Sequence, residues 1–266
     1  MEVLLAQLES AVRDPRANAG RAAVALAAHP EVALAVFPEL FLTAYHLRSV
    51  DETALPADAE ELRTVASAAA RAGTAVVIGF AERLEHGGYA NSVACIDADG
   101  SLAGVYRKAQ LYASEREVFE PGAELRLVRL AGRVVAPLIC FDIEFPELAR
   151  SLAVAGAELL VTASANMEPY GDEHELATRA RALENRVPHV YVNAIGDIGP
   201  LRFVGRSRSI GPGGDVLAEL GSGEELLVAP VAAPAADPNL DYLRALPPPL
   251  PVVGAEALVQ DARRGR

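Results

Sequence analysis

The sequence predicts an α/β fold in which two helix-covered sheets stack as a four-layer α–β–β–α sandwich. Short apolar segments, typical of strands buried on both faces, alternate with alanine-rich and charged segments of helical length in each half of the chain. Each half also contains strands joined by a turn of acidic and glycine residues, at 87–108 and 207–231. Two sheets that each carry helices on one face bury their other faces best against each other.

The first half of the chain is expected to supply one sheet and the two helices that cover it. Gly73 comes directly after the second helix, and glycine adopts the left-handed conformation that commonly ends a helix without strain. Strands are expected at 3–8, 32–37, 74–83, 87–97 and 101–108, and helices at 14–28 and 57–72.

The second half repeats this alternation of strands and helices. Pro146 suits the first turn of a helix, where its missing N–H leaves no hydrogen bond unmade. Strands are expected at 125–130, 134–139, 157–164 and 188–196, helices at 147–155 and 173–186, and a strand–turn–strand unit at 207–220 and 225–231.

We expect one domain over residues 1–231, because no linker divides this part of the chain. Residues 232–266 contain Pro234, Pro238 and the run PPPLP at 247–251. Such a proline-rich extension is unsuited to regular packing in a core. It is expected to lie on a partner subunit or across the protein's own surface.

Composition excludes several classes of function. The formal net charge of −12 and the pI near 4.9 argue against nucleic acid or an anionic membrane as a partner. No apolar run approaches the roughly 20 residues that span a bilayer, and the N-terminal segment with Glu2 and Gln7 does not have the basic region of a signal peptide. Cys95 and Cys140 lie in different contexts, which predicts no disulfide framework and a cytoplasmic location.

Cys140 is predicted at a sharp corner between the strand 134–139 and the helix 147–155. The polar residues Asp142 and Glu144 follow it within four positions. Such a corner exposes a side chain at the sheet edge and turns backbone N–H groups toward the group under attack, as a nucleophile requires. The ordinary alternative is a small buried residue that ends a strand.

Glu39 and Lys108 also follow predicted strands, and side chains at the carboxyl ends of neighbouring strands converge on one crevice. A thiol is only a few per cent thiolate at neutral pH, so it needs a base or a cation nearby. Glu39 can accept the proton of Cys140, while Lys108 and the Phe141 N–H can stabilise an oxyanion. Taken singly, Glu39 could be an acid in the first turn of a helix and Lys108 a solvated charge.

The histidines offer no better partner for the cysteine, because they fall in predicted helix ends or loops. They also show no spacing typical of a metal site. These residues are His29, His46, His86, His174 and His189.

Three segments resemble the signature segments of the nitrilase superfamily of carbon–nitrogen hydrolases: FPELFLTAY around Glu39, YRKAQLY around Lys108 and LICFDIEFPE around Cys140. The resemblance implies an α–β–β–α sandwich of the nitrilase type, homodimers, no cofactor or metal, and a thioester on the cysteine. It also implies a second glutamate before a Pro-Gly pair, best matched by Glu115 and next by Glu117. One departure is Gln110, where family members often carry histidine.

The resemblance further implies an amidase that hydrolyses a small aliphatic carboxamide, including ω-amino amides, to the acid and ammonia. Glu144 and Glu168 could attract a substrate amino group. A nitrilase or an N-carbamoyl amidohydrolase is the alternative within the superfamily, and Arg179 or Arg202 could then bind a substrate carboxylate. A non-catalytic interaction subunit is the alternative outside enzymes. The candidate substrate-binding residues are Tyr45, Tyr112, Phe141, Glu144, Asn166 and Met167, with Tyr170 as a further wall residue.

Overall fold

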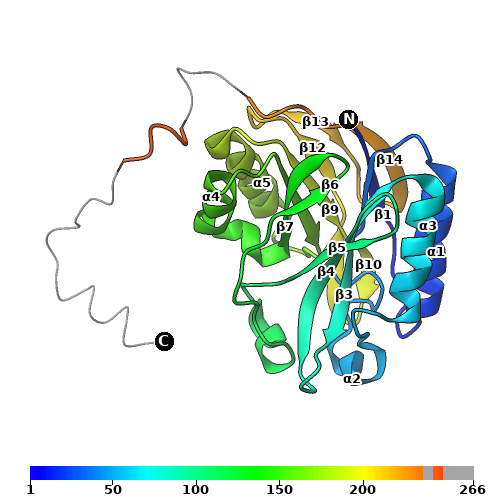
Figure 1. The fold of residues 1–266 in the computed structure, drawn as a ribbon. Helices are drawn as coiled ribbons and strands as arrows, with labels where there is room; N and C mark the ends of the chain where they lie inside the picture. Colours follow the sequence, from blue (N-terminus) through cyan, green and yellow to red (C-terminus); the bar gives the residue numbers. More distant parts are fainter. Residues whose placement is uncertain (236–241, 248–266) are drawn as a thin grey trace, which may run out of the picture.

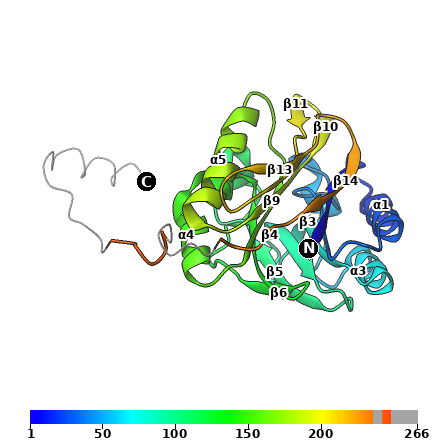
Figure 2. The same cartoon turned by 90° about the horizontal axis from the view of Figure 1, so that it is seen from above.

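Two six-stranded sheets lie face to face in the computed structural model, which describes residues 1–235 and 242–247. Helices α1 and α3 cover the outer face of one sheet, and α4 and α5 cover the outer face of the other (Figures 1 and 2). The predicted α–β–β–α sandwich is therefore confirmed.

The first sheet has the strand order β14-β1-β2-β3-β4-β5. Strands β1, β2 and β3 run parallel, and antiparallel pairing adds β14 at one edge and β4 and β5 at the other. The carboxyl ends of β2, β3 and β5 consequently point the same way. The bounds are β1 Glu2–Gln7, β2 Leu34–Val36, β3 Ala75–Arg83, β4 Tyr89–Ile96, β5 Leu102–Arg107 and β14 Glu225–Pro230.

Local sequence signals set the ends of the helices on this sheet. Helix α1 (Pro15–Ala28) begins after Asp14, whose side chain accepts a hydrogen bond from the Ala17 N–H at 3.0 Å. Helix α3 (Glu60–Ala72) ends at Gly73, which has a φ of +67°. The short helix α2 spans Val50–Thr53, directly after a 3-10 turn at Leu47–Ser49.

The second sheet has the order β13-β12-β9-β8-β7-β6, and a separate hairpin pairs β10 with β11. Strands β7, β8 and β9 run parallel, so their carboxyl ends lie at one edge. The strands are β6 Val128–Leu130, β7 Arg133–Ile139, β8 Leu159–Ser164, β9 His189–Asn193, β10 Ile195–Ile198, β11 Leu201–Val204, β12 Arg208–Ile210 and β13 Val216–Glu219, and the helices are α4 Pro146–Val154 and α5 Gly171–Asn185.

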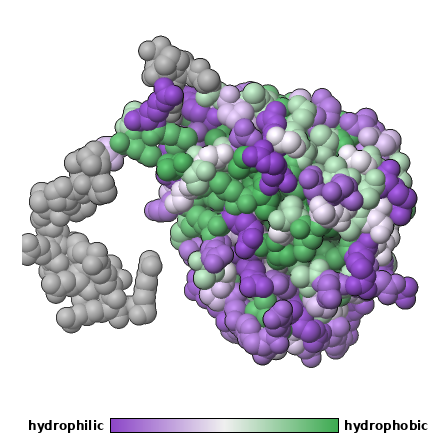
Figure 3. Space-filling view, viewed as in Figure 1, coloured by the Kyte–Doolittle hydropathy of each residue, from purple (hydrophilic) through white to green (hydrophobic). Residues whose placement is uncertain are grey.

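Buried apolar side chains fill each of the three spaces between the layers. One cluster joins α1 and α3 to the first sheet, a second lies between the sheets, and a third joins α4 and α5 to the second sheet. Strands buried on both faces explain why the sequence shows continuous apolar runs instead of alternation. Apolar residues also gather on the surface over the strands between the two helix pairs (Figure 3).

The single strand predicted at 188–196 is wrong, because the chain leaves the sheet after Asn193 and continues as β10. The Ala194 N–H donates to the Ser164 carbonyl, and the Ala194 carbonyl accepts from the Gly205 N–H. Gly196 then takes a φ of +87°, which favours glycine. The break points β10 and β11 away from the sheet.

The predicted extension 232–266 falls largely on residues 236–241 and 248–266, which lie outside the described residues. Two of its described residues, Ala235 and Tyr242, contact Arg186, which directly follows helix α5 of the same chain. The Ala235 N–H donates to the Arg186 carbonyl, and the Arg186 guanidinium lies 4.8 Å from the centre of the Tyr242 ring. In the described part of the chain, no helix is long and apolar enough to cross a membrane.

Candidate active site

Cys140 lies directly after β7, at the start of a 3-10 helix that spans Cys140–Glu144 and leads into α4. Its φ is +45°, a left-handed conformation that costs free energy for a residue with a side chain. The expected corner between strand and helix is therefore present. Strain of this kind persists only where the surrounding contacts fix the backbone.

The buried carboxylate of Asp142 braces this corner. It accepts hydrogen bonds from the Ile139 N–H at 2.9 Å, the Gln110 N–H at 2.8 Å and the Tyr106 hydroxyl at 2.8 Å. Burial raises the pKa of Asp142 to about 6, and the two backbone bonds oppose this shift. The Asp142 side chain thus ties the Cys140 corner to the segment that follows Lys108.

Glu39, Lys108 and Glu115 form one buried cluster. The Lys108 Nζ donates to Glu39 Oε1 at 2.6 Å and to Glu115 at 2.9 Å, and none of the three residues is more than 2% exposed. Glu39 comes from the loop after β2, Lys108 directly follows β5, and Glu115 lies in a 3-10 turn at Ala113–Glu117. Glu117, the second choice from the sequence, is exposed.

Neighbouring side chains hold the two carboxylates in place. Asn91 donates from Nδ2 to Glu39 Oε1 at 2.7 Å and to Glu115 Oε1 at 3.1 Å. Tyr45 donates to Glu115 at 2.9 Å, and the Tyr112 N–H donates to its other oxygen at 2.7 Å. Among the described residues, Glu39 Oε2 has no hydrogen-bond partner. One oxygen of Glu39 is thus fixed while the other is available.

Burial and charge set the protonation behaviour of the cluster. Burial raises the pKa of Glu39 to about 7, although the Lys108 charge opposes this shift. Burial disfavours the Lys108 ammonium, but the charges of Glu39 and Glu115 outweigh it and raise the pKa of Lys108 well above its usual value. Burial and the Glu39 charge raise the pKa of the Cys140 thiol, against the effect of Lys108. Cys140 is thus electrostatically coupled to both residues.

Cys140 opens into a small cavity of about 110 Å³. The Tyr112 ring packs edge-on against Phe141 and Tyr170, with ring centres 5.4 and 6.2 Å apart, and makes an aromatic wall. The other residues that line the cavity are Glu144, Asn166, Met167 and His174. Five of the six candidate substrate-binding residues therefore surround Cys140, together with Tyr170.

Four other sequence hypotheses need correction. Tyr45 does not line this cavity, because its hydroxyl is turned to Glu115. Glu168 and Arg202 line a separate hollow of about 570 Å³. Arg179 donates to the Gly214 carbonyl at 2.9 Å, outside the cavity. None of these three residues, Glu168, Arg179 and Arg202, lines the cavity at Cys140.

His174 was not expected at the site, because it was interpreted only as a residue at a helix end. It lies in the first turn of α5, is 2% exposed and lines the cavity. His189 is not in a loop but begins β9, where it bonds to Thr162 at 2.8 Å. Nothing in the local sequence distinguishes these two buried histidines from exposed ones.

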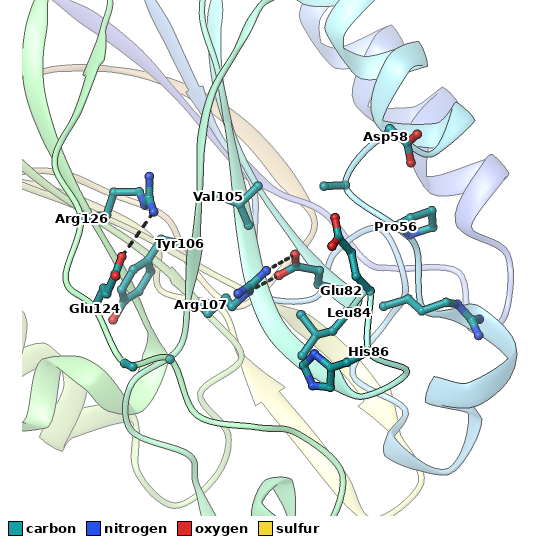
Figure 4. Close-up of a pocket in the computed structure, with 15 residues that line it drawn as sticks. Pro56, Asp58, Glu82, Leu84, His86, Val105, Tyr106, Arg107, Glu124 and Arg126 are labelled. Atoms are coloured by element: carbon teal, nitrogen blue, oxygen red, sulfur yellow. Dashed lines mark hydrogen bonds and ion pairs between the residues drawn. The ribbon is translucent and has the colours of Figure 1, made fainter.

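A larger hollow of about 930 Å³ lies away from Cys140, over β3 and β5 (Figure 4). Four of its charged residues form two ion pairs. Arg107 makes two bonds of 2.7 Å to Glu82, and Arg126 lies 3.6 Å from Glu124. Because no cysteine, serine or threonine is among the residues that line this hollow, the cavity at Cys140 is the better candidate for the active site.

Cys95 and Cys140 are both buried and form no disulfide. In the part of the chain that the structure describes, no three His, Cys, Asp or Glu side chains are grouped to hold a metal ion.

The fold and the buried glutamate, lysine and cysteine are typical of a hydrolase that acts on a carbonyl or nitrile carbon. The chain matches the carbon–nitrogen hydrolase family over residues 3–237 and belongs to this family. The resemblance to the nitrilase superfamily and the prediction of an enzyme that acts on amides are confirmed by this match and by the relatives.

Two curated relatives and one solved structure illustrate the similarity. An (R)-stereoselective amidase of a Pseudomonas species is 42% identical over 65% of this chain and 63% of its own length. A hydrolase encoded 5′ of pqqF in Pseudomonas protegens is 38% identical over 71% and 68%. The amidase of Nesterenkonia sp. AN1 has a TM-score of 0.83 and 27% identity, covering 98% of this chain and 96% of that one. That structure is a glutamate-to-glutamine mutant with the acetamide moiety of fluoroacetamide attached to the active-site cysteine.

Proposed function

We propose that this protein hydrolyses a small aliphatic carboxamide to a carboxylic acid and ammonia through a thioester on Cys140. The observation that carries the proposal is a cavity at Cys140 with room only for a short acyl chain, next to a buried Glu39–Lys108–Glu115 cluster whose Glu39 and Lys108 charges act on the Cys140 thiol. The covalent adduct on the cysteine of the Nesterenkonia amidase supports the same nucleophile.

Glu39 is proposed as the general base and acid. Its pKa of about 7 suits a group that both takes and returns a proton near neutral pH, and its Oε2 has no partner among the described residues. Glu39 takes the Cys140 proton as the sulfur attacks the amide carbon. It then gives this proton to the leaving nitrogen as the C–N bond breaks. In the second half of the reaction, Glu39 takes a proton from water as the water oxygen attacks the thioester. The C–S bond then breaks, the acid is released, and Glu39 returns the proton to the Cys140 sulfur.

Lys108 is proposed to stabilise the oxyanion that forms at each attack, together with the Phe141 N–H. The raised pKa of Lys108 keeps it charged at every working pH. Donors that point at a developing oxyanion in a dry site commonly contribute about 3–4 kcal/mol to lowering the barrier. Glu115 is proposed to orient Lys108, since it receives hydrogen bonds from four groups and is fully buried.

The polar groups of the cavity support a preference for short acyl groups, including those that end in an amine, over acyl groups that end in a carboxylate. Asn166 Nδ2 donates to the Tyr170 carbonyl at 3.3 Å, which leaves its buried Oδ1 without a partner among the described residues. Glu144 also lines the cavity, so it presents a carboxylate and an amide oxygen, both acceptors. Neither Arg179 nor Arg202 lines it, which disfavours N-carbamoyl acids as substrates.

Ammonia release from a panel of small amides, ω-amino amides, nitriles and N-carbamoyl acids tests this proposal. We expect turnover of the amides, with the Cys140→Ala variant folded but inactive. Acid formed only from nitriles or only from N-carbamoyl compounds would favour the alternatives within the superfamily. No turnover and no hydroxamate from amides plus hydroxylamine would favour the non-catalytic interaction subunit.

We also propose a cytoplasmic homodimer, with the small amide as the other partner. Leu176 and Leu183 on α5 and Val154 on α4 are 71%, 42% and 59% exposed, so the outer layer of the second sheet carries apolar side chains that a second copy would cover. Two unpaired cysteines are consistent with a reducing compartment.

A further inference from the structure

A chain of buried side chains connects the Cys140 thiol to the far side of the cavity. Ser164 ends β8 beside Cys140, because β7 and β8 run parallel with Ile139 opposite Ala163, and the Tyr191 hydroxyl donates to Ser164 Oγ at 3.0 Å. His174 Nδ1 lies 3.0 Å from the Tyr191 oxygen, and its Nε2 lies 3.2 Å from Glu144 Oε1. This path reaches the sulfur from the second sheet, whereas Glu39 and Lys108 follow strands of the first.

The groups of this chain are shielded from water. Ser164 is 0% exposed, Tyr191 1% and His174 2%. They lie on β8, β9 and α5, which are packed elements and not loops. Hydrogen bonds in such surroundings are stronger than in water and hold the groups they join in fixed orientations.

The direction of each hydrogen bond explains why this series of hydrogen-bonded side chains needs each of its members. A serine hydroxyl has one hydrogen, so Ser164 can donate it to Cys140 only if Tyr191 supplies the hydrogen of the bond between Tyr191 and Ser164. Tyr191 then has only acceptor capacity left for His174, whose Nδ1 must be the donor. Nε2 of the ring lies 3.2 Å from Glu144 Oε1 and donates to this carboxylate when the imidazole carries both protons.

The Tyr191 ring is also held from two sides. The His174 ring packs against it at an angle of 71° with centres 5.8 Å apart, and the Arg208 guanidinium lies 5.6 Å from its centre. Arg208 is itself 1% exposed and lies 3.2 Å from Glu219. These contacts leave the Tyr191 hydroxyl little freedom to turn away from Ser164.

We propose that Ser164 is a positioning residue that donates a hydrogen bond to the Cys140 sulfur, and that Tyr191 and His174 orient its hydroxyl for this purpose. The inference rests on the proposed role of Cys140 as nucleophile. A donor at sulfur stabilises the thiolate, whose formation burial and the Glu39 charge oppose.

The test compares Ser164→Ala and Tyr191→Phe with Thr162→Val. Thr162 is a matched control, because it lies on the same strand, is fully buried and bonds through its hydroxyl to His189, outside the chain. The readouts are the rate of Cys140 alkylation by iodoacetamide as a function of pH, located by peptide mass mapping, and kcat and KM for butyramide. Circular dichroism checks the fold of each variant.

Ser164→Ala is expected to slow alkylation near pH 8 roughly ten-fold and to move the midpoint of the pH profile upward, because the thiolate loses one donor. Tyr191→Phe is expected to act in the same direction with a smaller effect. In both variants kcat should fall while KM changes less than about two-fold. Thr162→Val should leave the pH profile unchanged.

An unchanged alkylation profile in folded Ser164→Ala would overturn the proposal. If Ser164→Ala does not fold, Tyr191→Phe decides, because it removes one oxygen without changing the ring, and a wild-type profile there overturns the proposal as well. Alkylation needs no turnover, so a wild-type protein that hydrolyses no amide would refute the proposed function without deciding the role of Ser164.

Discussion

Cys140 carries a thiol whose pKa is raised by burial, so the neutral form dominates near pH 7 and a base must remove its proton. Glu39 has a pKa of about 7 for the same physical reason, and the nearby Lys108 keeps it from rising further. Burial thus makes the cysteine a poor nucleophile alone but brings the carboxyl group into the range of an effective base.

The pH dependence of turnover should follow Glu39. A general base acts as the carboxylate, so kcat/KM for a small amide is expected to fall as the pH is lowered through about 7, the pKa of Glu39. Stopped assays of ammonia release between pH 5 and 9 measure this limb. A limb centred near 4.5, the ordinary pKa of a glutamate, would show that Glu39 is not the titrating base.

Replacing Lys108 by methionine should lower kcat about 10²-fold to 10³-fold, because the oxyanion loses a charged donor. The same change should move the acidic limb of the pH profile to higher pH, because the Lys108 charge lowers the pKa of Glu39 in the wild type. Lys108 is the only lysine of the sequence, so the site has a primary amine that no neighbouring lysine can replace. Wild-type kcat in this variant would contradict the proposed role.

At the scale of elements, the position of Cys140 depends on how the corner between β7 and α4 is held. The 3-10 helix Cys140–Glu144 begins with a left-handed residue, and the Asp142 carboxylate compensates by accepting three hydrogen bonds. Two of these come from backbone N–H groups, and the one from Ile139 is fully buried, where a donor without a partner costs free energy.

Asp142→Asn is therefore expected to lower the free energy of unfolding by about 1–3 kcal/mol, because its amide nitrogen cannot accept from a backbone N–H. Tyr106→Phe removes only one of the three donors and should cost less. Urea denaturation of both variants measures the difference. Equal stability of Asp142→Asn and the wild type would show that the carboxylate does not brace the corner.

Particular residues show what the sequence could predict. The continuous apolar run before Cys140 identified a doubly buried strand, and the polar residues at strand ends identified Glu39, Lys108 and Cys140, because strand ends converge by topology. Tyr45 was expected in the substrate pocket but does not line the cavity at Cys140, and the local sequence does not reveal that its hydroxyl bonds to Glu115.

The hydrogen-bonded series of Ser164, Tyr191 and His174 could not be predicted from the sequence, for a similar reason. Ser164, Tyr191 and His174 are 10 to 27 positions apart along the chain in different elements, and each has an ordinary residue type for its element. Their meeting depends on how α5 packs on the second sheet. The tertiary contact, not a local pattern, creates this part of the site.

At the scale of the whole molecule, the two outer helix layers differ in what they expose. Leu176 and Leu183 on α5 and Val154 on α4 are 71%, 42% and 59% exposed, while on α1 Val24 is the comparable exposed residue, at 71%. A proposed dimer through the α4 and α5 layer accounts for this difference, since covering apolar area stabilises association.

Leu176→Glu is expected to convert the dimer to a monomer, because it places a charge in the covered face. Val24→Glu serves as the matched control and should leave the assembly unchanged. Size-exclusion chromatography with light scattering measures the mass of each variant. A wild-type monomer, or a Leu176→Glu dimer as stable as the wild type, would contradict the proposed interface.

The central claim is that Cys140 carries the acyl group of an amide substrate, and quenched-reaction mass spectrometry tests it most directly. With butyramide present, acid-quenched wild-type protein should carry a mass increase of one butyryl group in place of hydrogen, located on the peptide that contains Cys140, and Cys140→Ala should carry none. Steady release of ammonia by Cys140→Ala, or a butyryl group on any other residue, would contradict the account.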